Sequence, residues 1–197
     1  MEHIIPTKKQ INNITNQNIK NFESKRLILI EAVKSHFDIY EYQFTDKRIW
    51  TYMYEKYIVQ ESYAQWVQKL LTLSSKNIDK IFSIYSKQYD EIVGLIRLHN
   101  ISSKHCKAEI ITLIFYNRQN QGFGIESKQI LINYAFDVLN LNRIEFYIDI
   151  NNYKSIKSNI KLGACFEGTL REHMILNNSY KRSSHLFSLL RSEWKNV

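Results

Sequence analysis

The placement of glycine constrains the fold of this chain more than any other sequence feature. The 197 residues include five glycines, and two of them, Gly122 and Gly124, share the corner RQNQGFGIES. The strand-like apolar run KAEIITLIFY precedes this corner, and apolar residues recur with the helical period after it. A helix that begins at such a corner presents unpaired backbone N–H groups and the positive end of its dipole. The pattern predicts a strand, a tight turn and a helix, with an anion-binding site at the turn.

The corner matches neither of two common nucleotide-binding motifs. It lacks the GxGxxG spacing and the GK[ST] of a Walker loop, so the sequence does not favour a dinucleotide or ATP. In the next predicted helix, Lys154, Lys157 and Lys161 share one face, and Arg118 lies at the edge of the corner. These cations could receive a polyphosphate by charge attraction. A flexible turn beside a solvated lysine stripe stays open as the alternative interpretation.

The order of the remaining elements indicates one α/β domain. A polar, Asn- and Gln-rich extension over residues 1–22, with a short helix around 8–20, is expected before a domain over 23–197. The domain should hold a mixed, mostly antiparallel sheet flanked by helices. The expected strands are 26–31, 80–87, 91–100, 107–116, 142–150, 164–176 and 183–194, and the expected helices are 33–44, 60–73, 125–139 and 151–163.

The composition favours a basic, cytoplasmic protein. The net charge is +8 and the pI is about 9.3, which suits nucleic acid, a ribosomal surface or a phosphorylated cofactor as partner. The longest apolar run has seven residues, whereas a bilayer span needs about 20, and no secretory signal is evident. Cys106 and Cys165 lack CxxC spacing and are expected to stay reduced. No His or Cys pair has metal-ligand spacing, so we expect no metal.

From about Lys25 to Trp194 the chain resembles the GNAT acetyltransferases, most nearly the ribosomal-protein N-acetyltransferase branch. The segment QNQGFG is similar to the family's [QR]xxGx[GA] corner, whose backbone amides hold the pyrophosphate of acetyl-CoA. The segment NNYKS, followed by Gly163, resembles the NxxS motif of that branch. The resemblance implies an acetyl-CoA site formed by Ile114, Phe115, Gln119, Asn120, Gln121, Gly122, Phe123, Gly124, Asn152 and Ser155.

Four positions depart from the pattern of the family. Phe115 or Tyr116 stands where a proline usually precedes the corner, and Ala164 stands where an aromatic residue follows Gly163. Asn159 occupies the position at which many relatives carry a tyrosine that acts as an acid toward the CoA thiolate. Ser183 falls about where an aspartate near the acceptor site is common. Neither of these last two roles carries over to this chain.

The resemblance implies direct acetyl transfer from the CoA thioester to an amine, without a covalent enzyme intermediate. The amine must be neutral, the oxyanion needs a donor and the thiolate needs a proton or a hydrogen bond. We expect Glu109 to act as the base, directly or through a water, and Ser155 to serve the thiolate. A backbone N–H of Ile114 or Phe115 is the expected oxyanion donor. A structural salt bridge for Glu109 and a hydroxyl that only bonds backbone for Ser155 stay open.

Three residues are candidates for the acceptor site. His99 ends the predicted strand 91–100, and His173 lies in a segment typical of the family. Trp50 begins the aromatic segment WTYMYEKY, which could form a wall for a substrate amine. A structural role is the alternative for each histidine, and a place in the core or an interface is the alternative for the aromatic segment.

The leading functional hypothesis is an acetyl-CoA-dependent N-acetyltransferase that acts on a primary amine, with a ribosomal or other protein N-terminus as acceptor. A small amine such as an aminoglycoside, a polyamine or an amino sugar is the alternative acceptor. A non-catalytic module that binds acyl-CoA or nucleic acid is the alternative outside enzymes. We expect contact with nucleic acid only through a ribosome and no membrane partner, and a homodimer stays open.

Overall fold

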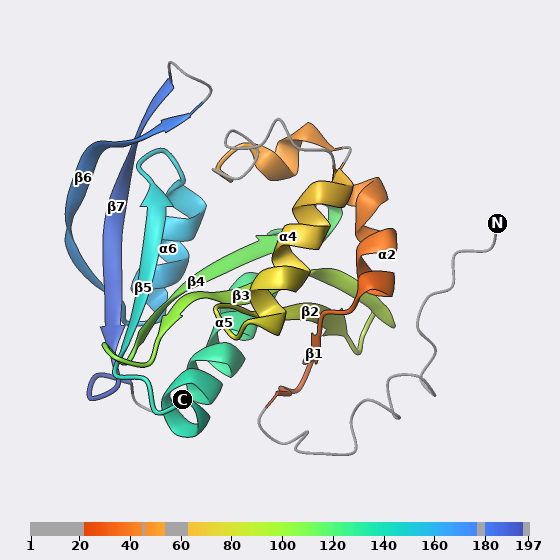
Figure 1. Cartoon of the computed structure of the whole chain (residues 1–197), viewed down its shortest axis with the longest axis horizontal. Helices are drawn as coiled ribbons and strands as arrows, with labels where there is room; N and C mark the ends of the chain where they lie inside the picture. Colours follow the sequence, from red (N-terminus) through yellow and green to blue (C-terminus); the bar gives the residue numbers. More distant parts are fainter. Residues whose placement is uncertain (1–21, 45, 54–62, 177–179, 195–197) are drawn as a thin grey trace.

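The computed structural model describes residues 22–44, 46–53, 63–176 and 180–194 (Figure 1). The expected strands and helices within these ranges are confirmed, with ends shifted by a few residues. The helix expected around 8–20 lies outside the described residues. The strands are β1 (Leu27–Glu31), β2 (Lys80–Ser86), β3 (Glu91–Ser102), β4 (Lys107–Ile114), β5 (Arg143–Asp149), β6 (Cys165–Leu176) and β7 (Tyr180–Leu190). The helices are α2 (Lys34–Phe44), α4 (Tyr63–Ser75), α5 (Phe123–Asn133) and α6 (Tyr153–Lys161), with 3₁₀ turns η2 (Lys47–Trp50) and η3 (Tyr116–Arg118) and a π-helical turn η4 (Tyr134–Val138).

The strands form one seven-stranded sheet in the order β1-β2-β3-β4-β5-β7-β6. Only β4 and β5 run parallel, and every other neighbouring pair is antiparallel, so the expected mixed, mostly antiparallel sheet is confirmed. The parallel pair shares three register positions, which end with Glu109 opposite Glu145. Beyond that pair the two strands diverge, and Figure 1 shows β5, β7 and β6 as a separate arm. A gap therefore opens in the middle of the sheet.

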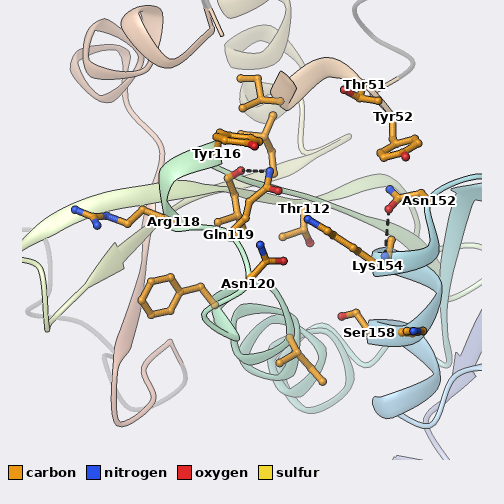
Figure 2. A pocket seen from close by; sticks show the side chains of 18 of the residues that line it. Thr51, Tyr52, Thr112, Tyr116, Arg118, Gln119, Asn120, Asn152, Lys154 and Ser158 are labelled. Atoms are coloured by element: carbon orange, nitrogen blue, oxygen red, sulfur yellow. Dashed lines mark hydrogen bonds between the residues drawn. The ribbon is translucent and has the colours of Figure 1, made fainter. Parts of the chain in front are cut away.

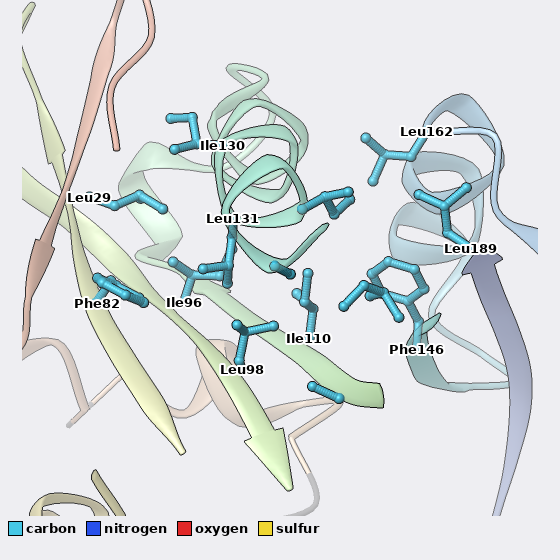
Figure 3. Packing of buried hydrophobic residues seen from close by; sticks show 14 of the residues in the cluster. Leu29, Phe82, Ile96, Leu98, Ile110, Ile130, Leu131, Phe146, Leu162 and Leu189 are labelled. Atoms are coloured by element: carbon cyan, nitrogen blue, oxygen red, sulfur yellow. The ribbon is translucent and has the colours of Figure 1, made fainter. Parts of the chain in front are cut away.

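The two faces of the sheet pack against different helices. Successive residues of a strand point to opposite faces, and in β3 Ile96 and Leu98 join one core cluster while Leu95, before them, joins the other. The first cluster packs against α5, including Leu131, as Figure 3 shows. The second cluster packs against α2 and α4 through residues such as Phe37, Trp66 and Leu70. The sheet thus separates a layer of α5 and α6 from a layer of α2 and α4.

None of the helices in the described part of the chain combines the length and the apolar character that a bilayer span requires. Cys106 and Cys165 are both free thiols.

Gly94 lies at a close approach between β3 and β4, a role that the sequence did not reveal. A Cβ built at Gly94 would lie 2.2 Å from the carbonyl oxygen of Leu113 and 3.1 Å from Cα of Ile114. Both contacts are to backbone, which cannot move aside as a flexible side chain could. Any side chain at this position would push β3 away from β4, the strand that borders the gap.

We predict that Gly94→Ala lowers the free energy of unfolding by about 1–3 kcal/mol, as overpacked cores do. Denaturant unfolding of the two proteins measures the difference. Gly124→Ala is the matched control, because a Cβ there would lie 3.6 Å from Cγ1 of Ile114, an ordinary contact. Equal stability of Gly94→Ala and the wild type would show that the strands can separate at no cost.

Candidate functional site

The gap between β4 and β5 holds a cavity of about 930 Å³, here called the corner cavity. Its walls are the end of β4, the glycine corner with the start of α5, and the first turns of α6 (Figure 2). Eight of the ten predicted cofactor residues line it, namely Ile114, Gln119, Asn120, Gly122, Phe123, Gly124, Asn152 and Ser155. The structure therefore brings together two segments that lie about 30 residues apart in the sequence.

Gly122 gives the corner its shape. It is the N-cap of α5 with φ of 84°, a left-handed conformation that residues with a Cβ rarely adopt. The first helical hydrogen bond runs from Glu126 N to Gly122 O at 3.1 Å, so the amides of Phe123, Gly124 and Ile125 have no acceptor within the helix. These N–H groups and the helix dipole favour an anion at this end of the corner cavity.

Arg26 and Glu126 hold the corner against β1. The Arg26 Nη1 donates to the Gln121 carbonyl at 3.0 Å, and its Nε donates to Glu126 Oε2 at 2.7 Å. Burial raises the pKa of the Glu126 carboxyl, but hydrogen bonds from Ser24 and Arg26 outweigh burial and hold that pKa below its ordinary value. The Gln121 side chain accepts from Tyr89 at 3.0 Å. Gln121 thus contacts the outer side of the corner and not the cavity.

The start of α6 forms the opposite wall. The Asn152 Oδ1 accepts a hydrogen bond from Ser155 N at 3.2 Å, so Asn152 caps α6 (Figure 2). The three lysines at 154, 157 and 161 all line the corner cavity and are exposed. Figure 2 shows Lys154 reaching from α6 toward the middle of the cavity. The amide corner and the lysines thus supply positive charge from two sides.

Arg118 contributes less to this charge than the sequence suggested. Its Nε donates to Glu91 Oε1 at 2.5 Å, and its guanidinium lies 4.0 Å from the ring centroid of Tyr89. In Figure 2 the Arg118 side chain points away from Asn120 and Lys154. Although Arg118 lines the rim, its charge is paired with a carboxylate.

Of the two backbone N–H groups expected as oxyanion donors, the structure excludes that of Phe115. The N–H of Phe115 donates to the Val93 carbonyl at 3.0 Å, and its side chain is buried in the cluster with Trp66. Successive N–H groups of a strand point to opposite sides, so the Ile114 N–H points away from β3 and toward the gap. Ile114 stays the predicted donor, and Phe115 does not. Thr112, two residues earlier, has a buried hydroxyl with no hydrogen-bond partner among the described residues.

A small cavity of about 80 Å³, here called the gap cavity, lies where β4 and β5 part. Glu109 and Ser155, the two predicted catalytic residues, both line it. Ser155 also lines the corner cavity, whereas Glu109 also lines a third cavity of about 540 Å³ on the other side. The gap cavity therefore lies next to both larger cavities and shares lining residues with each.

The third cavity, here called the His99 cavity, contains both predicted acceptor histidines. The Nδ1 of His99 lies 3.0 Å from both carboxylate oxygens of Asp79, which is fully buried. Burial raises the pKa of Asp79, but the hydrogen bond and charge of His99 outweigh burial and lower that pKa. His173 stacks on Tyr147 with ring centroids 6.5 Å apart. His99 is held in a fixed orientation, and His173 is exposed at the rim.

The carboxylates of the His99 cavity are balanced by cations. Glu145 is buried, and it accepts from Lys107 Nζ at 3.1 Å and from Arg143 Nε at 2.8 Å. Arg182 lines the same cavity, and its Nε lies 3.5 Å from Asp149 Oδ2. The lining therefore carries charges of both signs around Glu109.

Trp50 does not line any of these three cavities. It packs edge-on against Trp66, with ring centroids 6.1 Å apart and an interplanar angle of 83°, beside the second core cluster. Its neighbours Tyr52 and Met53 line the corner and gap cavities instead. Residues 54–57 of the aromatic segment lie outside the described residues.

Sequence reasoning did not select Lys128 and Asn159, although both line the gap cavity. The Lys128 Nζ lies 3.2 Å from Asn159 Oδ1, and both side chains are buried. Burial lowers the pKa of Lys128 to about 8. One signal was present in the sequence: Lys128 falls three residues before Leu131 and seven before Ala135, on the apolar face of the helix.

Comparisons with known proteins agree with this geometry. The family model described as "Acetyltransferase (GNAT) domain" matches residues 26–164. The chain is 34% identical over 128 residues to the uncharacterized N-acetyltransferase p20 of Bacillus licheniformis, which covers 65% of this chain and 71% of that protein. It is 31% identical over 93 residues to the spermidine N(1)-acetyltransferase of Escherichia coli, which covers 47% of this chain and 50% of that protein. The matches thus span between half and about seven tenths of these relatives.

Solved structures share the fold at lower identity. The spermidine N-acetyltransferase of Vibrio cholerae, in complex with CoA and spermine, superposes with a TM-score of 0.76 at 22% identity over 86% of this chain and 98% of that chain. RimL, a ribosomal L7/L12 alpha-N-protein acetyltransferase, gives a TM-score of 0.74 at 18% identity over 85% of this chain and 91% of that chain. The family model covers well over half of the sequence. The chain therefore belongs to the GNAT family of N-acetyltransferases.

Proposed function

We propose that the chain transfers an acetyl group from acetyl-CoA directly to the α-amine of a protein N-terminus. The observation that carries this proposal is the position of Glu109. It is the last paired residue of β4 before the sheet parts, and it lines both the gap cavity and the His99 cavity. A base at this point reaches an amine that enters from one face of the sheet and a thioester that enters from the other.

Acetyl-CoA is proposed to occupy the corner cavity. The pyrophosphate binds the amides at the start of α5, and the exposed lysines of α6 neutralise the remaining phosphate charge. The acetyl-bearing end extends along the gap toward Glu109. The buried hydroxyl of Thr112 and the inward N–H of Ile114 are free to bond an extended ligand there.

The acceptor amine is proposed to enter through the His99 cavity. Glu109 removes a proton from the amine, directly or through a water, so that the nitrogen lone pair attacks the thioester carbonyl. The Ile114 N–H stabilises the oxyanion that forms. A protein α-amine has an ordinary pKa near 7.7–8.0, compared with about 10.4 for lysine. A larger fraction of the α-amine is therefore already neutral at neutral pH, and its deprotonation by the base costs less free energy.

A polyamine is the second candidate acceptor. A relative that is 31% identical is a spermidine N(1)-acetyltransferase, which favours this candidate. The lining of the His99 cavity weighs against it, because Lys107 and Arg182 lie beside the carboxylates and would repel a polycation. The net charge of +8 acts in the same direction over longer distances.

We predict that Gly122→Glu weakens acetyl-CoA binding by on the order of 100-fold or more. A side chain at a left-handed position costs about 1–3 kcal/mol, and the new carboxylate places a negative charge beside the phosphates. Calorimetric titration measures the loss. Lys76→Glu, an exposed charge change beyond the end of α4, is the control that should leave binding intact. Wild-type protein that does not bind acetyl-CoA would contradict the cofactor assignment.

We predict that Glu109→Gln lowers kcat/KM by about 10²–10⁴-fold while the Kd for acetyl-CoA stays unchanged, because only the proton transfer is lost. Thiol release is followed with three acceptors: a peptide with a free N-terminus, the same peptide with a blocked N-terminus and a free lysine, and spermidine. Glu31→Gln, at the exposed end of β1, is the control. Turnover of spermidine alone would move the proposal to the polyamine, and full activity of Glu109→Gln would exclude this residue as the base.

A further inference from the structure

Lys128 is a buried cation in a helix that is otherwise anchored by apolar side chains. Its residue is 6% exposed, and its Nζ lies 5.6 Å from the centroid of the Phe146 ring. In the part of the chain that the structure describes, no carboxylate forms an ion pair with it. Burying an ammonium without an ion pair costs desolvation free energy, so a functional role would explain why a lysine lies at this position.

The hydrogen bonds around Asn159 direct the ammonium. The Asn159 Nδ2 donates to the Ser155 carbonyl at 2.9 Å and to Ser155 Oγ at 3.3 Å. The amide oxygen is therefore turned away from Ser155, and Lys128 Nζ donates to it at 3.2 Å. An ammonium has three N–H donors, and this contact uses one of them. Lys128 lines both the corner cavity and the gap cavity, so it borders the space available to a bound thioester.

The pair also accounts for a departure from the family pattern. Asparagine at position 159 is shorter than the tyrosine common there in relatives, and it brings no hydroxyl to the gap cavity that it lines. Lys128 reaches across from α5 and ends beside the amide oxygen of Asn159. The ammonium of Lys128, on α5, thus borders the gap cavity in place of the tyrosine hydroxyl that many relatives carry on the helix equivalent to α6.

We propose that Lys128 is the catalytic acid that protonates the CoA sulfur; this inference rests on the proposed function. When the tetrahedral intermediate collapses, the carbon–sulfur bond breaks and its electron pair stays on sulfur. An N–H of Lys128 gives its proton to that sulfur, which releases CoA as the thiol and leaves a neutral lysine. Glu109 holds the proton taken from the amine, and exchange with solvent returns both side chains to their starting states.

The proton transfer from Lys128 to the CoA sulfur involves two groups of similar pKa. The lowered pKa of Lys128, about 8, lies near the ordinary thiol value of about 8.5, so a proton passes between nitrogen and sulfur with little cost in either direction. The other ionisable groups that line the gap cavity are Tyr52, Glu109, Tyr147, Asp149 and Arg182. Asp149 and Arg182 lie within 3.5 Å of each other and largely cancel.

The exposed lysines of α6 do not compete for this role. Lys154, Lys157 and Lys161 line the corner cavity but not the gap cavity. Their ammonium groups are solvated, and they suit the phosphates at the outer end of the ligand. Lys128 is the lysine whose side chain borders both cavities in the described residues.

The direct test is the ionisation of the thiol of bound CoA, which requires no knowledge of the acceptor. The ultraviolet absorbance of the thiolate is titrated with pH for CoA bound to the wild type and to Lys128→Met. We expect the bound thiol of the wild type to ionise at least about one pH unit lower, because a cation beside a thiolate stabilises it. Methionine keeps the apolar stem of lysine, so this variant should fold; Lys128→Gln is the second variant. Lys154→Met is the matched control, and it should weaken CoA binding without moving the thiol titration.

Two further readouts distinguish a role of Lys128 toward the CoA sulfur from a general role in binding CoA. CoA without its sulfur (desulfo-CoA) should bind equally well to the wild type and to Lys128→Met, because it lacks the group that Lys128 contacts. With an accepted amine, kcat should fall at least about tenfold in Lys128→Met and should recover in the double variant with Asn159→Tyr, which restores a hydroxyl donor.

Equal thiol titration in wild type and Lys128→Met would overturn the role of Lys128 while leaving the proposed function intact. Failure of the wild type to bind either ligand would overturn the proposed function, and this inference with it.

Discussion

The parting of β4 and β5 is the constraint on which the rest of the site depends. Two parallel neighbours that remained paired along their full length would give a closed sheet without a path through it. Here the pairing ends at Glu109 and Glu145, and β5 continues with β7 and β6 as a separate arm. Backbone groups of β4 beyond that point, such as the Ile114 N–H, face an open gap. Strand edges of this kind need partners, and an extended ligand can supply them.

The gap also places the two proposed proton-transfer groups on opposite faces of the sheet. Glu109 shares a cavity with His99 on the side of α4, and Lys128 approaches from α5 on the other side. A direct ion pair between them would hold both in their charged forms. Lys128 instead contacts the neutral amide of Asn159, and burial lowers its pKa. Separate environments of this kind are how one site can hold a base and an acid at the same pH.

The local parts of this site could be predicted from the sequence. The tight turn before α5 and the start of α6 depend on residues a few positions apart, and both are found as expected. The order of strands and helices followed from periodicity, since each element carries its own apolar pattern. The resemblance to the family added what local patterns could not supply, namely that the corner and the start of α6 form a single cavity.

The remaining features depend on contacts between distant segments. The end of pairing after Glu109 reflects the register of strands that are more than 30 residues apart, and no local pattern encodes it. The contact between Lys128 and Asn159 joins two helices, so sequence reasoning showed Asn159 only as a departure from the family pattern and did not select Lys128. Trp50 was predicted to face the substrate because aromatic residues suit both a cavity wall and a core, and only its packing against Trp66 distinguishes them.

The central claim is that the gap between β4 and β5 carries the thioester from the glycine corner to a point between Glu109 and Lys128. A crystal structure of the protein with CoA tests this most directly. The account predicts the pyrophosphate on the amides of Phe123, Gly124 and Ile125, and the sulfur in the gap cavity within hydrogen-bonding reach of Lys128 Nζ. A sulfur directed out of the gap, or a pyrophosphate bound away from the corner, would contradict it.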